Sequence, residues 1–153
     1  MSPVDAPQKP AWRPQSILFV CSENSVRSPM AEALARKISG NKIYVASVGL
    51  RRGRIDDFAA TVLREIGIEG GIRAPRALED FEDEAFDLVV SLTPEARDRI
   101  AEFARGAPTT LVYWPTPDPT VVEGSRENVL DAYRGVRDGL VRRIRDLVGT
   151  ETA

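Results

Sequence analysis

An apolar run that stops at a cysteine constrains the fold of this chain more than any other feature. Residues 17–20 read Ile-Leu-Phe-Val, Cys21 follows, and five further residues separate it from Arg27. Pro29 then opens a pattern of apolar residues at helical spacing. The order is therefore buried strand, loop and helix. In a loop of this length, successive backbone N–H groups and the helix N-terminus can point at one spot, so we predict an anion-binding site.

Cys21 and Arg27 stand at the two ends of this loop. A positive field that holds an anion also favours a thiolate over a thiol, and a guanidinium offers two parallel donors to an oxyanion. The chain has one Cys, which excludes an internal disulfide. Its position at the end of a strand, facing a polar loop, indicates a reactive thiol rather than a buried apolar side chain. We therefore predict that Cys21 is a nucleophile beside a bound anion.

The pattern Cys-(five residues)-Arg-Ser-Pro, with Asn24 inside the loop and Met-Ala-Glu at residues 30–32, resembles the low-molecular-weight protein tyrosine phosphatases and the related thioredoxin-coupled arsenate reductases. The resemblance covers residues 16–148. It implies that Cys21 attacks phosphorus and that Arg27 binds the equatorial oxygens. It also implies that Asn24 holds the shape of the loop and that Ser28 hydrogen-bonds the sulfur.

The resemblance also implies a phosphate-binding loop and two supporting side chains. Ser47, at the end of the second predicted strand, resembles the family Ser that supports the loop Asn, although it can equally be a turn residue. Arg73 falls near a family His that braces the loop, and a plain surface Arg is the alternative. The phosphate-binding residues would be Ser22, Glu23, Asn24, Ser25, Val26, Arg27 and Ser28.

Strands and helices alternate along the rest of the chain. This order predicts an α/β fold in which a four-stranded parallel sheet has helices on both faces, a three-layer α/β/α sandwich with function at the carboxyl ends of the strands. On the second helix, Ile66 is predicted to belong to the inward stripe. The predicted strands are 17–20, 42–48, 88–90 and 109–113, and the predicted helices are 28–39, one capped by Asp56 or Asp57 and running to 66, 94–104 and 125–148.

Composition fits one domain and excludes several kinds of partner. The chain has 153 residues, 42% hydrophobic, with 21 Lys plus Arg against 23 Asp plus Glu. This balance gives no general attraction to nucleic acid or to an anionic membrane. The residues 1–14 hold four prolines, so we predict a Pro-rich, disordered or extended leader before a single domain at 15–150. With no long apolar run or signal-like start, we expect a soluble, cytoplasmic protein.

A second chemical stretch follows the fourth predicted strand. Three prolines within residues 113–119 make a stiff loop that presents Asp118. The chain has no His, so a proton donor must be Asp, Glu, Tyr, Lys or water. Asp118-Pro119 also stands where the family has its Asp-Pro general acid. The resemblance thus implies that Asp118 first protonates the leaving group and then activates water, with no metal and no cofactor. A nearby phosphate and partial burial are expected to favour its protonated form.

Five positions carry separate expectations. Glu23 stands where relatives usually have Gly, and we expect its side chain to point to solvent instead of repelling phosphate. Val26 replaces a second Cys, and Thr-Val at residues 120–121 replaces the aromatic pair that usually flanks phosphotyrosine. Trp114 is expected either to form a wall of the pocket or to lie in the core or at its rim.

The sequence leaves three functions open. The first is a phosphomonoester hydrolase, a protein tyrosine phosphatase that acts on a phosphorylated protein or a small phosphomonoester. The second is an arsenate reductase. The related reductases have a resolving Cys near the position of Thr93, and Thr93 has no thiol. Arsenate reduction by this chain would therefore need an external thiol such as glutathione, mycothiol or glutaredoxin. The third is a catalytically weak regulatory module that binds inorganic phosphate or another tetrahedral oxyanion.

Overall fold

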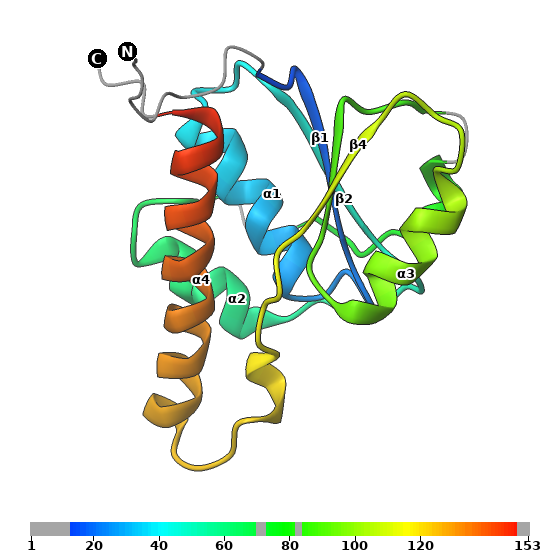
Figure 1. Cartoon of the computed structure of the whole chain (residues 1–153). Helices are drawn as coiled ribbons and strands as arrows, with labels where there is room; N and C mark the ends of the chain where they lie inside the picture. Colours follow the sequence, from blue (N-terminus) through cyan, green and yellow to red (C-terminus); the bar gives the residue numbers. More distant parts are fainter. Residues whose placement is uncertain (1–12, 70–72, 82–83, 150–153) are drawn as a thin grey trace, which may run out of the picture.

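The computed structural model describes residues 13–69, 73–81 and 84–149, so the predicted leader lies outside the described residues except for its last two. One sheet of four parallel strands has the order β2-β1-β3-β4. Figure 1 shows α1, α2 and α4 on one face of this sheet and α3 on the other. The predicted α/β fold is confirmed. The elements are β1 (Ser16–Cys21), α1 (Arg27–Ile38), β2 (Tyr44–Gly49), α2 (Asp57–Arg64), η1 (Leu78–Phe81), β3 (Leu88–Ser91), α3 (Pro94–Phe103), β4 (Thr110–Tyr113), η2 (Pro119–Val121) and α4 (Arg126–Val148).

Strand β1 lies inside the sheet and divides the core into two parts. Ile17 and Phe19 pack toward α1, α2 and α4, and both are fully buried. Leu18 and Val20 pack toward α3 and η1. Successive side chains of a strand point to opposite faces, so a continuous apolar run suits a strand that is covered on both sides. Burial of each large side chain contributes about 1.5–3 kcal/mol, and it fixes the end of β1 in space.

The predicted helix boundaries are correct to within about two residues, mostly because the caps are polar side chains with clear signals. Asp56 caps α2 by accepting hydrogen bonds from two backbone amides at 2.9 and 3.2 Å. Ser125 caps α4 in the same way. The prediction for Ile66 is wrong: α2 ends at Arg64, and Ile66 is 42% exposed.

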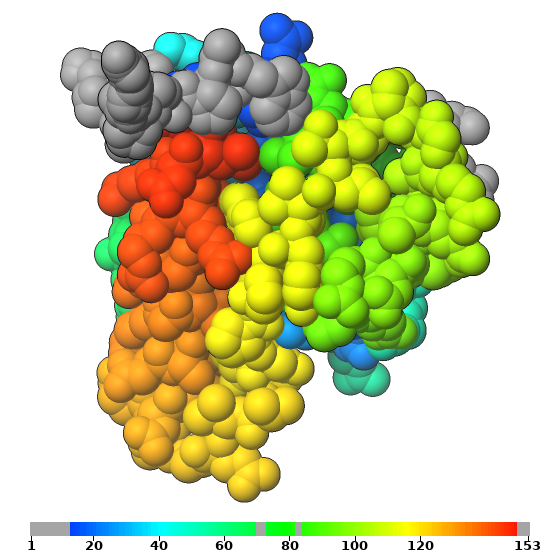
Figure 2. Space-filling model, viewed as in Figure 1, coloured from blue at the N-terminus to red at the C-terminus, as the bar shows by residue number. Residues whose placement is uncertain are grey.

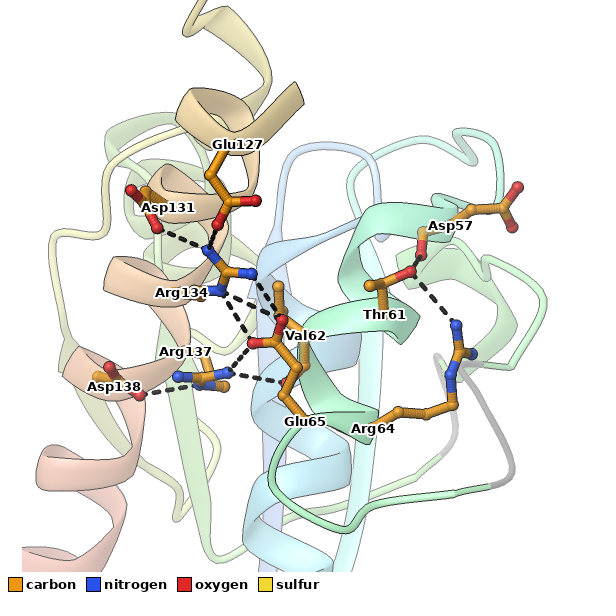
Figure 3. Close-up of polar contacts among 10 residues, drawn as sticks. All are labelled: Asp57, Thr61, Val62, Arg64, Glu65, Glu127, Asp131, Arg134, Arg137 and Asp138. Atoms are coloured by element: carbon orange, nitrogen blue, oxygen red, sulfur yellow. Dashed lines mark hydrogen bonds and ion pairs between the residues drawn. The ribbon is translucent and has the colours of Figure 1, made fainter. Parts of the chain in front are cut away.

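Helices α2 and α4 are joined by Glu65 (Figure 3). Its carboxylate accepts hydrogen bonds from Arg134 at 2.7 Å and from Arg137 at 2.9 Å. Arg137 also donates to the carbonyl of Val62 at 2.9 Å. Hydrogen bonds from Arg134 and then from Arg137 outweigh desolvation and lower the pKa of Glu65 to about 2. These contacts fix α4 against the C-terminal end of α2.

The segment after β4 brings a second chain region to the same edge of the sheet as Cys21. The Trp114 amide donates to the Ser91 carbonyl at 2.8 Å, and the Thr116 amide donates to the Leu92 carbonyl at 3.2 Å. Figure 2 shows the segment, in yellow, lying along α4, in orange. The Asp118 loop therefore has a fixed path past the carboxyl end of β3. In the described part of the chain, no helix is long and apolar enough to cross a membrane.

Candidate active site

The loop between β1 and α1 encloses a cavity of about 340 Å³. Cys21 ends β1 and is 2% exposed, while α1 begins at Arg27. The first amides of a helix have no intrahelical partner, and Val26 makes no side-chain cap, so these amides are available to a bound anion. The cavity is lined by Cys21, Ser22, Glu23, Ser25, Val26, Arg27, Arg51, Asp118 and Thr120.

Asn24 and Ser28 hold the loop and the sulfur. Asn24 has a φ of 55°, a left-handed conformation that Asn tolerates better than most residues. Its side chain donates to the Ser28 hydroxyl at 2.8 Å and to the Ser47 hydroxyl at 3.0 Å, and it accepts from the Arg76 amide at 2.7 Å. The sulfur of Cys21 lies 2.9 Å from the Ser28 hydroxyl and 3.3 Å from the Asn24 amide nitrogen. Two donors can therefore stabilise a thiolate here.

Glu32 is a supporting residue to which the sequence analysis assigned no role. It is 3% exposed, and its carboxylate accepts from the Ser47 hydroxyl at 2.6 Å. The same carboxylate lies 3.0 Å from Arg73, whose side chain is 53% exposed. Arg73 is therefore a surface residue, and it also pairs with a buried acid that supports the loop. Two further arginines, Arg36 and Arg76, lie 2.5 and 3.4 Å away. The available signal was the spacing: Glu32 follows Ser28 by four residues, which places both on one face of α1.

Replacement of Glu32 by Gln is expected to destabilise the protein by about 2 kcal/mol, because the three arginines lose the charge that they share. Their partial exposure limits the loss. Chemical denaturation measures the free energy of unfolding. Glu127→Gln is the matched control, since Glu127 is 70% exposed and pairs with Arg134 at the surface; its loss should stay below about 1 kcal/mol. Equal losses in the two variants would contradict a structural role specific to Glu32.

The segment after β2 supports the loop through its backbone. The Leu50 amide donates to the Cys21 carbonyl at 3.1 Å, and the Gly53 amide donates to the Glu23 carbonyl at 2.7 Å. Between them, the Arg51 amide donates to the Ser22 carbonyl at 3.0 Å. A Cβ atom on Gly49 would lie 2.6 Å from backbone atoms of the loop. Backbone packing at this distance requires glycine, a requirement that no pattern in the sequence predicts.

Arg27 and Asp118 face each other across the cavity. One guanidinium nitrogen of Arg27 donates to the Thr116 carbonyl at 3.1 Å, and another lies 3.8 Å from Oδ2 of Asp118. The amide of Thr120 donates to Oδ1 of Asp118 at 2.9 Å, and its hydroxyl donates to the same atom at 2.6 Å. The structure therefore brings the three predicted catalytic residues, Cys21, Arg27 and Asp118, to one cavity.

The protonation of Asp118 depends on opposing effects. Burial raises the pKa of its carboxyl, as expected from the sequence. The hydrogen bonds from Thr120 and the charge of Arg27 outweigh burial, so the pKa lies below its ordinary value. The contribution of Thr120 was not predicted from the sequence, because it depends on a local turn. A phosphate bound beside the carboxyl would act in the opposite direction to Arg27.

The rim of the cavity carries charged side chains. Glu23 lines the cavity, and its side chain is 58% exposed, as expected for a side chain that reaches solvent. Arg51 pairs with both oxygens of Glu95 at 3.0 and 3.2 Å, and Glu95 also accepts from the Ser22 hydroxyl at 3.1 Å. Trp114 does not line the cavity; its ring lies 6.1 Å from that of Phe19, on the core side. Among the described residues, no group of three His, Cys, Asp or Glu side chains is arranged to hold a metal ion.

Comparison with known proteins identifies the family. The model of the family described as low molecular weight phosphotyrosine protein phosphatase matches residues 16–152. The chain belongs to this family. Membership agrees with the sheet order and with the loop between β1 and α1, and it makes the chain a low-molecular-weight phosphatase-like enzyme.

Similar proteins in the low-molecular-weight phosphatase family carry two kinds of name. An arsenate reductase of Halalkalibacterium halodurans is 31% identical over 134 residues, which cover 88% of this chain and 95% of that protein. A glutaredoxin arsenate reductase of Synechocystis is 29% identical and covers 88% of this chain and 96% of its own length. The solved YwlE arginine phosphatase of Geobacillus stearothermophilus is 30% identical with a TM-score of 0.72, covering 88% of this chain and 91% of that one.

Proposed function

We propose that this chain is a protein tyrosine phosphatase that hydrolyses phosphomonoesters through a cysteinyl-phosphate on Cys21. One observation carries the proposal: Cys21, Arg27 and Asp118 line a single cavity, and the Cys21 sulfur lies within hydrogen-bonding distance of two donors. The cavity opens at the carboxyl end of the sheet, where α/β proteins bind their ligands. Its substrates would be phosphorylated proteins or small phosphomonoesters, and its product inorganic phosphate.

In the first step, the Cys21 thiolate attacks phosphorus in line with the departing oxygen. Arg27 and the amides at the start of α1 bind the three equatorial oxygens, on which negative charge accumulates. Asp118 gives its proton to the leaving oxygen, and the bond from phosphorus to that oxygen breaks. The enzyme is left with a phosphorus–sulfur bond and an ionised Asp118.

In the second step, water replaces the sulfur. Asp118, now a carboxylate, accepts a proton from the attacking water, and the phosphorus–sulfur bond breaks to release phosphate and the thiolate. The Ser28 hydroxyl and the Asn24 amide lie at the sulfur, so they stabilise the thiolate as it leaves. The lowered pKa of Asp118 suits this second role, in which the carboxylate must be ionised.

Asp118→Asn is expected to lower kcat/KM about 100-fold for phenyl phosphate, whose leaving group is a strong base. The loss for a dinitrophenyl phosphate should be roughly tenfold or less, because that leaving group departs without a proton. The measurement is kcat/KM, which reports the steps up to transfer of the phosphoryl group to Cys21. An equal loss for both esters would contradict the acid role of Asp118.

Arsenate reduction with an external thiol is the second candidate, since the chain is 29% identical to a glutaredoxin arsenate reductase. The single Cys makes an internal resolving thiol impossible, and Thr93 instead hydrogen-bonds the loop through Ser22 at 3.3 Å. Arsenate reduction with glutathione, mycothiol or glutaredoxin, measured beside hydrolysis of phosphotyrosine and phosphoarginine on one sample, separates the candidates. Turnover of arsenate with a thiol, but of neither phosphorylated compound, would replace the phosphatase assignment.

A further inference from the structure

Two donors of Thr120 bind one oxygen of Asp118. The Thr120 hydroxyl lies 2.6 Å and its amide 2.9 Å from Oδ1. The other oxygen, Oδ2, lies 3.8 Å from Arg27, which lines the same cavity as Cys21. The two oxygens of this carboxylate therefore have different surroundings.

We propose that Thr120 is a positioning residue, whose hydroxyl holds Oδ1 so that Oδ2 is the atom that exchanges a proton with the substrate. The proposal deepens the proposed function and rests on its assignment of Asp118 as acid and base. A proton transfer requires the two heavy atoms to lie within hydrogen-bond distance in the reacting complex. A carboxylate with one oxygen already bound presents the other in a narrow range of directions.

The surroundings of Asp118 explain why this contact matters. Pro119 has no N–H and is buried, so it fixes the backbone but contributes no donor to the carboxylate. The Asp118 side chain is 38% exposed, and its two side-chain torsions would otherwise allow it to turn toward water. The aromatic pair expected from the family is absent from residues 120–121, and Thr120 lines the cavity in its place.

Thr120 also affects which form of Asp118 prevails. Hydrogen bonds to a carboxylate stabilise its ionised form, and the Arg27 charge acts in the same direction. Tyr133, on α4, and Asp56, which accepts its hydrogen bond at 2.8 Å, are titratable groups on this side. Burial, a hydrogen bond to Asp56 and the charge of Asp118 raise the pKa of Tyr133, so it remains neutral. Across the cavity lie Cys21, Glu23 and Arg51.

The test replaces Thr120 by Val, which keeps the branched shape and removes the hydroxyl. The experiment measures kcat/KM for phenyl phosphate as a function of pH. The alkaline limb of this profile reports loss of the proton from the general acid. Without the hydroxyl, Asp118 keeps its proton to higher pH, so the alkaline limb should move to higher pH. On the acid side, kcat/KM should fall roughly tenfold, because the carboxyl is no longer held.

Three further variants separate the possible results. Thr120→Ser keeps a hydroxyl and should restore the wild-type position of the alkaline limb. Val121→Ala changes a neighbour that is 71% exposed and should behave as wild type. Asp118→Asn should abolish the limb. If Asp118→Asn abolishes it but Thr120→Val leaves its position unchanged, the Thr120 proposal is overturned while the proposed function stands. If Asp118→Asn keeps the wild-type limb, the acid assignment itself fails, and the Thr120 proposal fails with it.

Discussion

Cys21→Ala is expected to lower turnover of phenyl phosphate by roughly 10⁴-fold or more, since removal of a nucleophile takes away the covalent route. Affinity for inorganic phosphate should remain close to that of the wild type. Arg27 and the amides at the start of α1 are unchanged by the substitution, and they supply the anion site. Steady-state kinetics measures the first effect, and isothermal titration with phosphate measures the second.

The same variant discriminates the enzyme from an oxyanion-binding regulatory module. A buried Cys replaced by Ala leaves a small cavity, which costs about 1 kcal/mol of the free energy of unfolding, so a thermal melt must accompany the kinetics. A module without catalysis predicts tight phosphate binding in both proteins and equally slow turnover in both. That result would remove the mechanism on Cys21 and leave only binding.

The sequence predicted those parts of the fold that depend on local signals. Residues 17–20 and 88–90 are uninterrupted apolar runs, and the structure buries both as inner strands. Asp56 is a polar cap before a helical stripe, and it does cap α2. Cys21 and Arg27 could be found because one short loop carries both, so their separation in the sequence limits their separation in space.

The remaining parts of the site depend on contacts between distant segments. Glu32 is a buried acid only because Ser47 and Arg73 reach it from other parts of the chain. Gly49 is required by a backbone contact with residues 23–24, and the sequence shows no periodic pattern that predicts this contact. The contact of Thr120 with Asp118 is an exception, since it spans only two residues; it was missed because the sequence does not show which of several turn types these residues adopt. Sequence patterns report burial and caps more directly than such packing.

Gly49→Ala is expected to destabilise the protein by about 3 kcal/mol, a large effect for one methyl group. The added Cβ would lie 2.6 Å from the Asn24 amide nitrogen, the Glu23 carbonyl carbon and the Arg51 carbonyl oxygen. All three are backbone atoms, so the clash is relieved only by a shift of the loop. In a domain of this size, the melting temperature should fall by roughly 6–12 °C. The same shift moves the Asn24 amide away from the sulfur, so kcat/KM should fall about 100-fold.

Gly135→Ala provides the matched control for this prediction. Gly135 lies within α4, and nothing surrounds its added Cβ within 4 Å. Because Ala favours helix over Gly, this variant should gain about 0.5–1 kcal/mol and keep its activity. Gly53→Ala falls between the two. Its Cβ would meet the Ser25 hydroxyl, which can rotate, but also the Cβ and the carbonyl oxygen of Glu23 at 2.8 and 2.9 Å, and only the last is a backbone atom. The expected stability therefore decreases from Gly135→Ala through Gly53→Ala to Gly49→Ala, according to the atoms that each added Cβ meets.

If Gly49→Ala were as stable and active as the wild type, the backbone of residues 49–53 would not support the catalytic loop. In that case, the shape of the anion site would have to come from Asn24 and its hydrogen bonds alone.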